Sequence, residues 1–132
     1  MNQNNNKKLH QEWFDIADNE LNFARAGLEE LNAFYPQVCF LCQQSTEKYL
    51  KGFLVYSKKK FLKIHDLIQL IKLCAKIDKD FLNLLEKVDI LDQYYLVSRY
   101  PLEYPPAGKE QAKEALETAT NIINFIRVKT NY

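Results

Sequence analysis

The chain has 132 residues, 47% of them hydrophobic, which suits one domain with its own core. Its 18 basic and 17 acidic residues give a net charge of +1. This balance excludes a strongly basic nucleic-acid clamp that relies on many phosphate contacts, but not a local basic groove. Residues 1–8 lack the apolar region of a signal peptide, and no apolar run reaches the ~20 residues of a membrane helix. We therefore expect a disordered tail over 1–8, a domain over 9–132 and a cytoplasmic location.

The helix breakers indicate the plan of the fold. Pro101, Pro105, Pro106 and Gly108 make one strongly loop-like segment, and Pro36 marks another turn. No segment shows sustained period-two alternation, so strands are not expected. We predict an all-α fold, an antiparallel up-and-down bundle of four long helices plus one shorter helix.

The first two helices are expected over 9–32 and 36–57, where Pro36 suits the first helical position. The apolar face predicted for the first helix consists of Trp13, Ala17, Leu21, Ala24, Leu28 and Leu31. The inner stripe predicted for the second consists of Cys42, Thr46, Tyr49, Phe53 and Tyr56.

The third and shortest helix is expected over 66–77, with Leu67, Leu70, Ile71 and Cys74 facing inward. Asp78 or Asp80 can cap the fourth helix, which should end near Arg99 and Tyr100 because Pro101 disfavours helical geometry before it. Its apolar positions are Phe81, Leu84, Leu85, Val88, Leu91 and Tyr95. The fifth helix is expected over 109–128, with an apolar stripe of Ala112, Ala115, Leu116, Ala119, Ile122, Ile123 and Ile126.

The three cysteines, Cys39, Cys42 and Cys74, favour reduced thiols, because their number is odd and no export signal precedes them. The C-x-x-C spacing of Cys39 and Cys42 is compatible with redox or zinc chemistry. No second pair exists, however, and both lie within a helical apolar pattern, so we expect buried core thiols. No metal and no cofactor are expected.

Two places remain for chemistry. Gln44, Glu47, Lys48 and Lys51 share a stripe of the second helix, and Glu47 precedes Lys51 by four residues, the favourable order for an ion pair. This stripe is either a hydrated helix face or part of a binding site.

The second place is the end of the fourth helix. Arg99 suits the helix dipole there, and Tyr94, Tyr95, Tyr100 and Tyr104 add stacking faces and hydroxyls. These groups either bind a base and a phosphate, or they pack against the rest of the protein with their hydroxyl groups at the surface. Composition and spacing favour neither interpretation.

These segments together resemble the HEPN domain family. The segment from Gln43 to Lys51 resembles its helix-two signature, and His65-Asp66-Leu67 resembles the start of its third helix. Ser98-Arg99-Tyr100-Pro101 resembles its Arg-Tyr-Pro helix end, and Trp13 with Ala24 resembles its first helix. The resemblance runs from about residue 9 to 128.

The resemblance implies a helical bundle that forms a homodimer and binds nucleotides or RNA. No membrane association is expected, because no apolar run is long enough to span a bilayer. Many members are metal-independent endoribonucleases, often toxins paired with a small nucleotidyltransferase antitoxin. The nucleotide-binding candidates that it implies are Gln44, Glu47, Lys48, Lys51 and Tyr100.

The family's catalytic motif is an Arg followed four to six residues later by a His, and two copies meet across the dimer interface. A general base would activate the ribose 2′-hydroxyl, while the Arg stabilises charge on the phosphoryl oxygens. Arg99 matches the motif, but its window holds Tyr104, Pro105 and Pro106, and no His follows His65.

The catalytic candidates are therefore Arg99 and Tyr104, although a tyrosine with a pKa of about 10 is a poor base near neutral pH. By the resemblance, Tyr104 is also the nearest acceptor for AMP transfer by an antitoxin. Glu47 either orients Arg99 or forms a structural ion pair, and His65 is expected to shape the start of the third helix.

Three functions follow. The favoured one is a HEPN module that associates with nucleotide or RNA and partners a nucleotidyltransferase, with weak or no catalysis. The alternatives are a metal-independent endoribonuclease toxin that uses Arg99 and a ligand-free dimeric scaffold.

Overall fold

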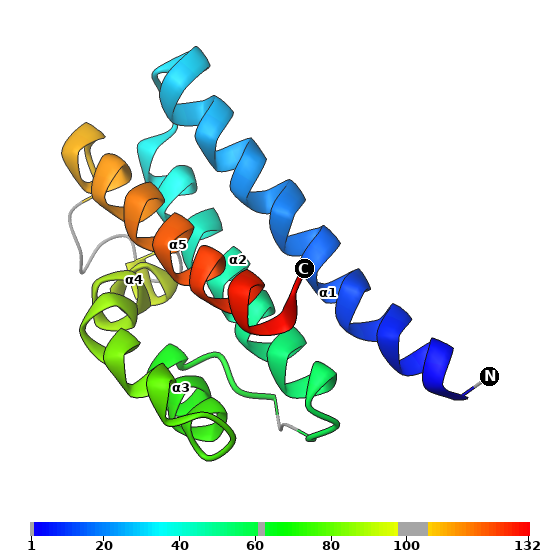
Figure 1. Cartoon of the computed structure of the whole chain (residues 1–132). Helices are drawn as coiled ribbons and strands as arrows, with labels where there is room; N and C mark the ends of the chain where they lie inside the picture. Colours follow the sequence, from blue (N-terminus) through cyan, green and yellow to red (C-terminus); the bar gives the residue numbers. More distant parts are fainter. Residues whose placement is uncertain (1, 61–62, 98–105) are drawn as a thin grey trace.

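The computed structural model describes residues 2–60, 63–97 and 106–132, and within them it contains helices and no strand. The elements are α1 (Asn2–Ala26), the π-helical turn η1 (Gly27–Leu31), α2 (Tyr35–Tyr56), α3 (Leu67–Ala75), the 3₁₀ helix η2 (Lys79–Leu84), α4 (Leu85–Val97) and α5 (Lys109–Thr130). The all-α bundle predicted from the helix breakers is confirmed (Figure 1).

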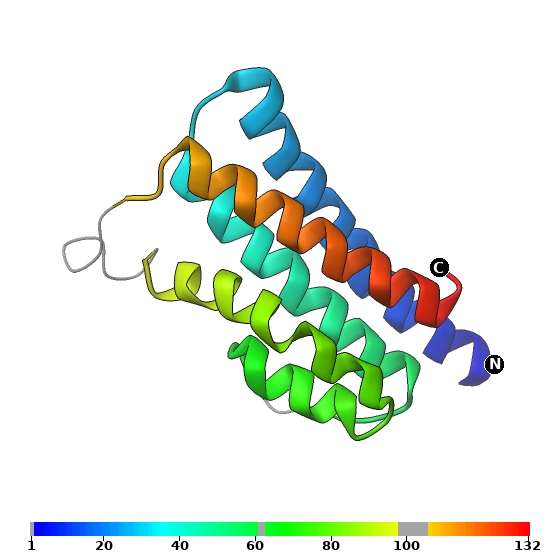
Figure 2. The same ribbon diagram turned by 60° about the vertical axis from the view of Figure 1, so that its left-hand side comes forward.

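α2 occupies the middle of the bundle. It packs against α1 most extensively, then against α5, α4 and α3. α1 lies along one edge of the molecule and the α3–α4 pair along the other, with α2 and α5 between them (Figures 1 and 2). α1 touches α5 along only a short stretch, so one flank of α1 has little of the chain against it.

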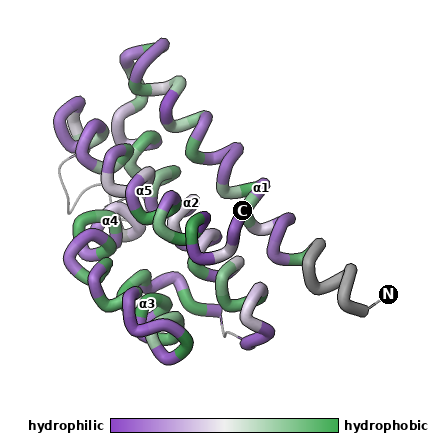
Figure 3. Tube along the Cα trace, viewed as in Figure 1, coloured by the Kyte–Doolittle hydropathy of each residue, from purple (hydrophilic) through white to green (hydrophobic). Residues whose placement is uncertain are grey.

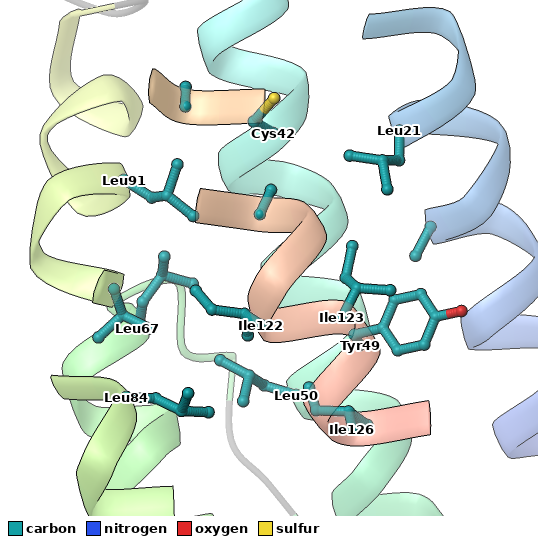
Figure 4. Close-up of a cluster of buried hydrophobic side chains, with 14 of the residues drawn as sticks. Leu21, Cys42, Tyr49, Leu50, Leu67, Leu84, Leu91, Ile122, Ile123 and Ile126 are labelled. Atoms are coloured by element: carbon teal, nitrogen blue, oxygen red, sulfur yellow. The ribbon is translucent and has the colours of Figure 1, made fainter. Parts of the chain in front are cut away.

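The core lies where α2 and α5 meet the other helices (Figure 4). The apolar stripes predicted for α3 and α5 are confirmed, because every residue in them is buried. Tyr49 of α2 is fully buried and stacks on Phe14 of α1, with ring centroids 4.5 Å apart.

The inner face of α1 differs from the prediction at both ends. Trp13 is half-buried, and the fully buried ring is that of Phe14, which continues the three-and-four spacing of Ala17 and Leu21. Leu31, also predicted to face inward, is exposed because the wider π-helical turn rotates it off that face.

The other helices show smaller differences. Four residues of the stripe predicted for α2 are buried, whereas Tyr56 is exposed at its last turn. Of the two caps predicted for the fourth helix, Asp78 is the one that forms, since its carboxylate accepts a hydrogen bond from the Asp80 amide at 3.0 Å. The element that it caps is the 3₁₀ helix η2, which leads into α4. In α4 the buried tyrosine is Tyr94, and Tyr95 is half-buried.

At the N-terminus, α1 begins at Asn2, whereas the sequence predicted a disordered tail over 1–8. The run of Asn, Gln and Lys there contains no Gly or Pro that would stop a helix. None of the helices in the described residues is long and apolar enough to span a membrane.

The prediction of buried thiols is confirmed. Cys39, Cys42 and Cys74 are fully buried and free of disulfides. Burial raises the pKa of Cys39 and of Cys74 to about 12. For Cys39, a hydrogen bond with Tyr94 has a smaller effect that lowers the pKa. The described residues also bring no three His, Cys, Asp or Glu side chains together as metal ligands.

Candidate functional site

A buried ion pair lies on the middle turns of α2. The Nζ atom of Lys51 lies 3.0 Å from Oε2 of Glu47, and the two side chains are only 8% and 5% exposed. The four-residue spacing places them side by side on the helix, as the sequence predicted. Burial is the unexpected part, because the sequence left open a hydrated helix face.

His65 completes this arrangement from the segment that precedes α3. Its Nδ1 atom lies 3.2 Å from Oε2 of Glu47, and its side chain is 49% exposed. Its ring stacks on Tyr95 of α4, with centroids 5.2 Å apart and an interplanar angle of 15°. Glu47 thus contacts one edge of the half-exposed imidazole of His65. The Nε2 atom of His65 has no hydrogen-bond partner among the residues that the structure describes.

Two glutamines extend the arrangement along α2. Gln43 donates from Nε2 to Oε1 of Glu47 and to the carbonyl oxygen of His65, each at 3.4 Å. Gln44 donates to Oε1 of Gln43 at 2.6 Å. We call Gln43, Gln44, Glu47, Lys51 and His65 the Glu47 network.

Local structure around α3 fixes the position of His65. Asp66 caps α3 by accepting from the Ile68 amide at 2.9 Å, which orients the residue just before it. Asp92 of α4 accepts from the Leu67 amide at 3.2 Å and so ties α3 to α4. Burial, together with a hydrogen bond that the protonated Asp92 carboxyl donates to Asp66, raises the pKa of Asp92 to about 6, although the hydrogen bond from the Leu67 amide lowers it.

Lys48 is not part of the Glu47 network. Its Nζ atom lies 2.9 Å from Glu20 of α1, and both side chains are about one-fifth exposed. Consecutive residues on an α-helix point about 100° apart, so Lys48 faces α1 while Glu47 faces His65. The predicted nucleotide-binding stripe is therefore divided between two faces of α2.

Arg99, Tyr100 and Tyr104 lie outside the described residues. The last described residue of α4 is Val97, and Tyr95, which stacks on His65, precedes Arg99 by four residues along the chain. The Glu47 network therefore reaches the helix that leads into the Arg99 segment.

Three members of this region were absent from the predicted site. Gln43 could have been found from the sequence, because it lies four residues before Glu47 on the same helix face. Tyr95 was predicted only as an apolar position or a stacking face. Asp92 had no sequence signal, because its partner Leu67 is 25 residues away.

The arrangement offers polar and aromatic groups that a ligand could contact. The Glu47 carboxylate is matched by the Lys51 ammonium, so it does not present an uncompensated negative charge to an anion. His65 offers a ring nitrogen that can donate or accept a hydrogen bond, depending on its tautomer. Tyr95 provides an aromatic face beside it.

Comparison with known proteins identifies the family. The HEPN domain model matches residues 10–129. The chain belongs to the HEPN domain family. No curated protein matches it by sequence.

Two solved structures are similar over nearly the whole chain. The crystal structure of TT1696 from Thermus thermophilus has a TM-score of 0.77 and 28% sequence identity, and the match covers 91% of this chain and 97% of that one. The crystal structure of ST0689, an archaeal HEPN homologue, has a TM-score of 0.73 and 26% identity, with 92% and 97% covered. In this HEPN domain, two of the segments that carry the resemblance, those of Glu47 and His65, contact each other.

Proposed function

We propose that this HEPN domain is a nucleotide- or RNA-binding module that partners a nucleotidyltransferase in a toxin–antitoxin-type system, with weak or no catalysis of its own. The observation that carries the proposal is the contact between Glu47 and His65. It joins two of the HEPN-like segments and connects them, through Tyr95, to the helix that precedes Arg99.

In this proposal, Arg99 binds a phosphate group and Tyr100 stacks on a base. A guanidinium group suits phosphate because it stays charged and donates two parallel hydrogen bonds. A tyrosine ring stacks on any base, which is typical of binding with little sequence preference. His65 serves as a further polar contact for the same ligand.

A binding titration tests the proposal. A labelled single-stranded RNA is titrated with the parent chain, with Arg99→Ala and with Arg25→Ala, a matched loss of one positive charge on α1. We expect Arg99→Ala to weaken binding by at least about tenfold, which corresponds to the loss of a charge-assisted hydrogen bond. Arg25→Ala should bind within about twofold of the parent. Absence of binding by the parent at low salt, or equal losses in both variants, contradicts the proposal and favours the ligand-free scaffold.

One observation favours the endoribonuclease as a second candidate. His65 is half exposed, and its Nδ1 is held by a buried carboxylate, which is a common arrangement for a proton acceptor. In this reaction the base takes the proton of the 2′-hydroxyl, the 2′-oxygen bonds to phosphorus, and the 5′-oxygen leaves with a proton from solvent.

Incubation with total RNA in EDTA separates the two candidates. Cleavage by the parent and not by Arg99→Ala establishes the nuclease, and EDTA excludes a contaminating metal-dependent enzyme. Intact RNA with both proteins, together with binding in the titration, supports the non-catalytic module.

The partnership has its own test. The chain is co-expressed with a small nucleotidyltransferase, and its intact mass is measured with ATP present. Gain of one AMP by the parent and not by Tyr104→Phe supports both the partnership and Tyr104 as the acceptor. Failure of the two proteins to co-purify, with an unmodified mass, contradicts this part of the proposal.

A further inference from the structure

A small pocket lies between the end of α2 and the end of α3. Three apolar residues and three lysines line it: Leu54, Leu73, Ile77, Lys59, Lys60 and Lys76. We call it the basic pocket. Its volume is about 250 Å³. Hydrophobic and hydrophilic positions meet at the end of α3, where the pocket lies (Figure 3).

The pocket forms because α2 and α3 end at the same end of the bundle (Figure 1). The segment that starts α3 lies beside the middle of α2, where His65 contacts Glu47. Farther along both helices, the Sγ atom of Cys74 lies 3.7 Å from the carbonyl oxygen of Leu50. α3 therefore runs alongside α2 in the same direction, and the last turns of both helices reach the pocket.

The turn after α2 positions the first lysines of the pocket. Lys58 has a φ of 59°, in the left-handed region, and the Lys59 amide donates to the carbonyl oxygen of Leu54 at 2.8 Å. This is the hydrogen bond of a Schellman motif, which folds the chain back over the last turn of the helix. Lys59 is thereby held against Leu54, which is 1% exposed and lies at the bottom of the pocket.

The lysines of the basic pocket bring unpaired charge. All three are exposed, and none forms an ion pair with a residue that the structure describes. Asp78, the acidic residue that follows the pocket in the chain, already lies 2.8 Å from Lys129. Residues 58–76 hold six lysines and one acidic residue, in a chain whose net charge is only +1. Positive charge is therefore concentrated in this part of the chain.

An ordinary explanation for lysines at helix ends is attraction to the helix dipoles. Each C-terminal end carries about half a negative charge, so two ends offset about one of the three lysine charges. The carbonyl groups at these ends are also partly satisfied by the backbone, since the Asp78 amide donates to the carbonyl oxygen of Cys74 at 3.0 Å. About two positive charges are therefore left for a ligand.

We propose that the basic pocket binds an acidic segment of another protein. One large apolar side chain of that segment enters the pocket, and carboxylates on either side of it pair with Lys59, Lys60 and Lys76. The apolar side chain removes its own surface and that of the pocket from water, while the carboxylates complement the charge around it. The ligand is thus defined by an apolar residue between acidic ones.

The shape of the pocket favours a peptide over other anionic partners. A membrane takes up apolar side chains that protrude, whereas Leu54 is buried at the bottom of the pocket. RNA would use the lysines and leave the apolar floor uncovered. The volume of about 250 Å³ is below the roughly 300–1,000 Å³ of pockets that enclose a whole small ligand, so it suits a single side chain.

The size of the pocket sets the expected strength. One side chain and a few charge pairs bury much less than the roughly 800 Å² per partner of a standard interface, so we expect a dissociation constant of about 10–100 μM. The pocket lies at the end of the bundle opposite to the end of α4, which leads into the Arg99 segment (Figure 2). Binding of an acidic segment is therefore independent of the proposed nucleotide binding, and the two can fail separately.

Fluorescence polarisation of labelled peptides with the full chain tests the class of ligand. The probe is Glu-Glu-Phe-Glu-Glu. Its controls are Gln-Gln-Phe-Gln-Gln, which lacks the charge, and Glu-Glu-Ala-Glu-Glu, which lacks the large apolar side chain. We expect both controls to bind at least about fivefold more weakly than the probe. Raising the salt concentration from about 50 to 500 mM should weaken binding of the probe at least about fivefold, because exposed charge pairs are screened.

Matched variants locate the site. Lys60→Gln/Lys76→Gln removes two charges from the pocket and should weaken binding of the probe at least about tenfold. Lys109→Gln/Lys113→Gln removes two exposed charges from α5 and should change the affinity less than about twofold. Ile77→Ser, which removes an exposed apolar side chain from the pocket without a change of charge, should weaken binding at least about threefold. Circular dichroism checks that all variants fold.

Several results would overturn the inference. The parent chain does not bind the probe at about 1 mM, or the two lysine double variants lose affinity equally. Equal binding of the probe and of Glu-Glu-Ala-Glu-Glu shows attraction between charges without use of the pocket. Sedimentation of the parent chain with phosphatidylserine vesicles, without binding of the probe, assigns the surface to a membrane. A loss of RNA affinity in Lys60→Gln/Lys76→Gln, again without binding of the probe, assigns the lysines to RNA.

Discussion

The Oε2 atom of Glu47 lies 3.2 Å from Nδ1 of His65, although the two residues are 18 positions apart in the chain. This contact joins the middle of α2 to the segment that starts α3. The carboxylate also carries the ion pair with Lys51, so one buried group organises both the packing of α2 and the orientation of the exposed imidazole.

The buried ion pair predicts strong coupling between Glu47 and Lys51. Glu47→Gln leaves the Lys51 ammonium buried without its carboxylate and should lower the free energy of unfolding by about 3 kcal/mol. The double variant Glu47→Gln/Lys51→Met removes both charges and should lie within about 1 kcal/mol of the parent. Urea unfolding measures both, and a double variant that loses the sum of the single losses would show that the pair does not act as a unit.

Asp92 predicts a pH dependence of stability. Its folded pKa of about 6 is above the roughly 3.9 of an unfolded chain, so the folded state binds more protons between these values. Stability is therefore lost as the pH rises from about 4 to 6. Asp92→Asn keeps an oxygen for the Leu67 amide and should be about 1 kcal/mol more stable than the parent at pH 7, after allowance for solvent screening.

The pH series contains its own control. At pH 4 the advantage of Asp92→Asn should be small, because the carboxyl is then mostly protonated in the folded state and partly protonated in the unfolded state. Chemical unfolding of both proteins from pH 4 to 7 measures the difference between their free energies of unfolding. A difference that is constant across this range contradicts the assignment to Asp92.

The close approach of Phe14 to Gly52 makes the α1–α2 contact sensitive to any side chain at position 52. A Cβ atom at this position would lie 2.5 Å from Cε1 of Phe14 and 3.2 Å from Cβ of Trp13. Phe14 is fully buried and has no room to move, so Gly52→Ala should cost about 1 to 2 kcal/mol even after the gain in helix propensity. Gly108→Ala, at the N-cap of α5, is the control with a smaller loss. Thermal unfolding compares the two, and equal losses would contradict the steric argument.

The cysteines predict low thiol reactivity. Burial raises the pKa of Cys39 and of Cys74 to about 12 and raises that of Cys42 as well, so little thiolate forms at pH 8. In the native chain, alkylation should be slow, and all three thiols should react rapidly in denaturant. Fast native labelling, or a mass two hydrogens lower after mild oxidation, would indicate that the C-x-x-C pair is accessible.

The sequence predicted the fold well where periodicity alone decides it. The stripes of α3 and α5 were found in full, because each presents one uninterrupted apolar face to the core. α1 was harder, since the stripe through Leu31 assumed a regular helix and η1 changes the number of residues per turn. No local pattern marks where such a turn occurs.

The candidate site was predictable in part for a similar reason. The pairing of Glu47 with Lys51 follows from spacing within one helix. The contacts of Glu47 with His65 and of Lys48 with Glu20 depend on how α2 is rotated between its neighbours, which only tertiary packing decides. The sequence therefore placed four polar residues on one stripe that the fold divides between two neighbours.

Because Glu47 and Lys48 point toward different neighbours, α2 connects the segment of His65 to Glu20 of α1. Any rotation of α2 about its own axis would shift the contact with His65 and the contact with Glu20 together. A ligand that restrains His65 would therefore also restrain the ion pair of Lys48 with Glu20 on the α1 side of the helix. Thermodynamic linkage requires such an effect to be reciprocal, so a change at the Lys48–Glu20 pair should alter the affinity for any ligand that binds at His65.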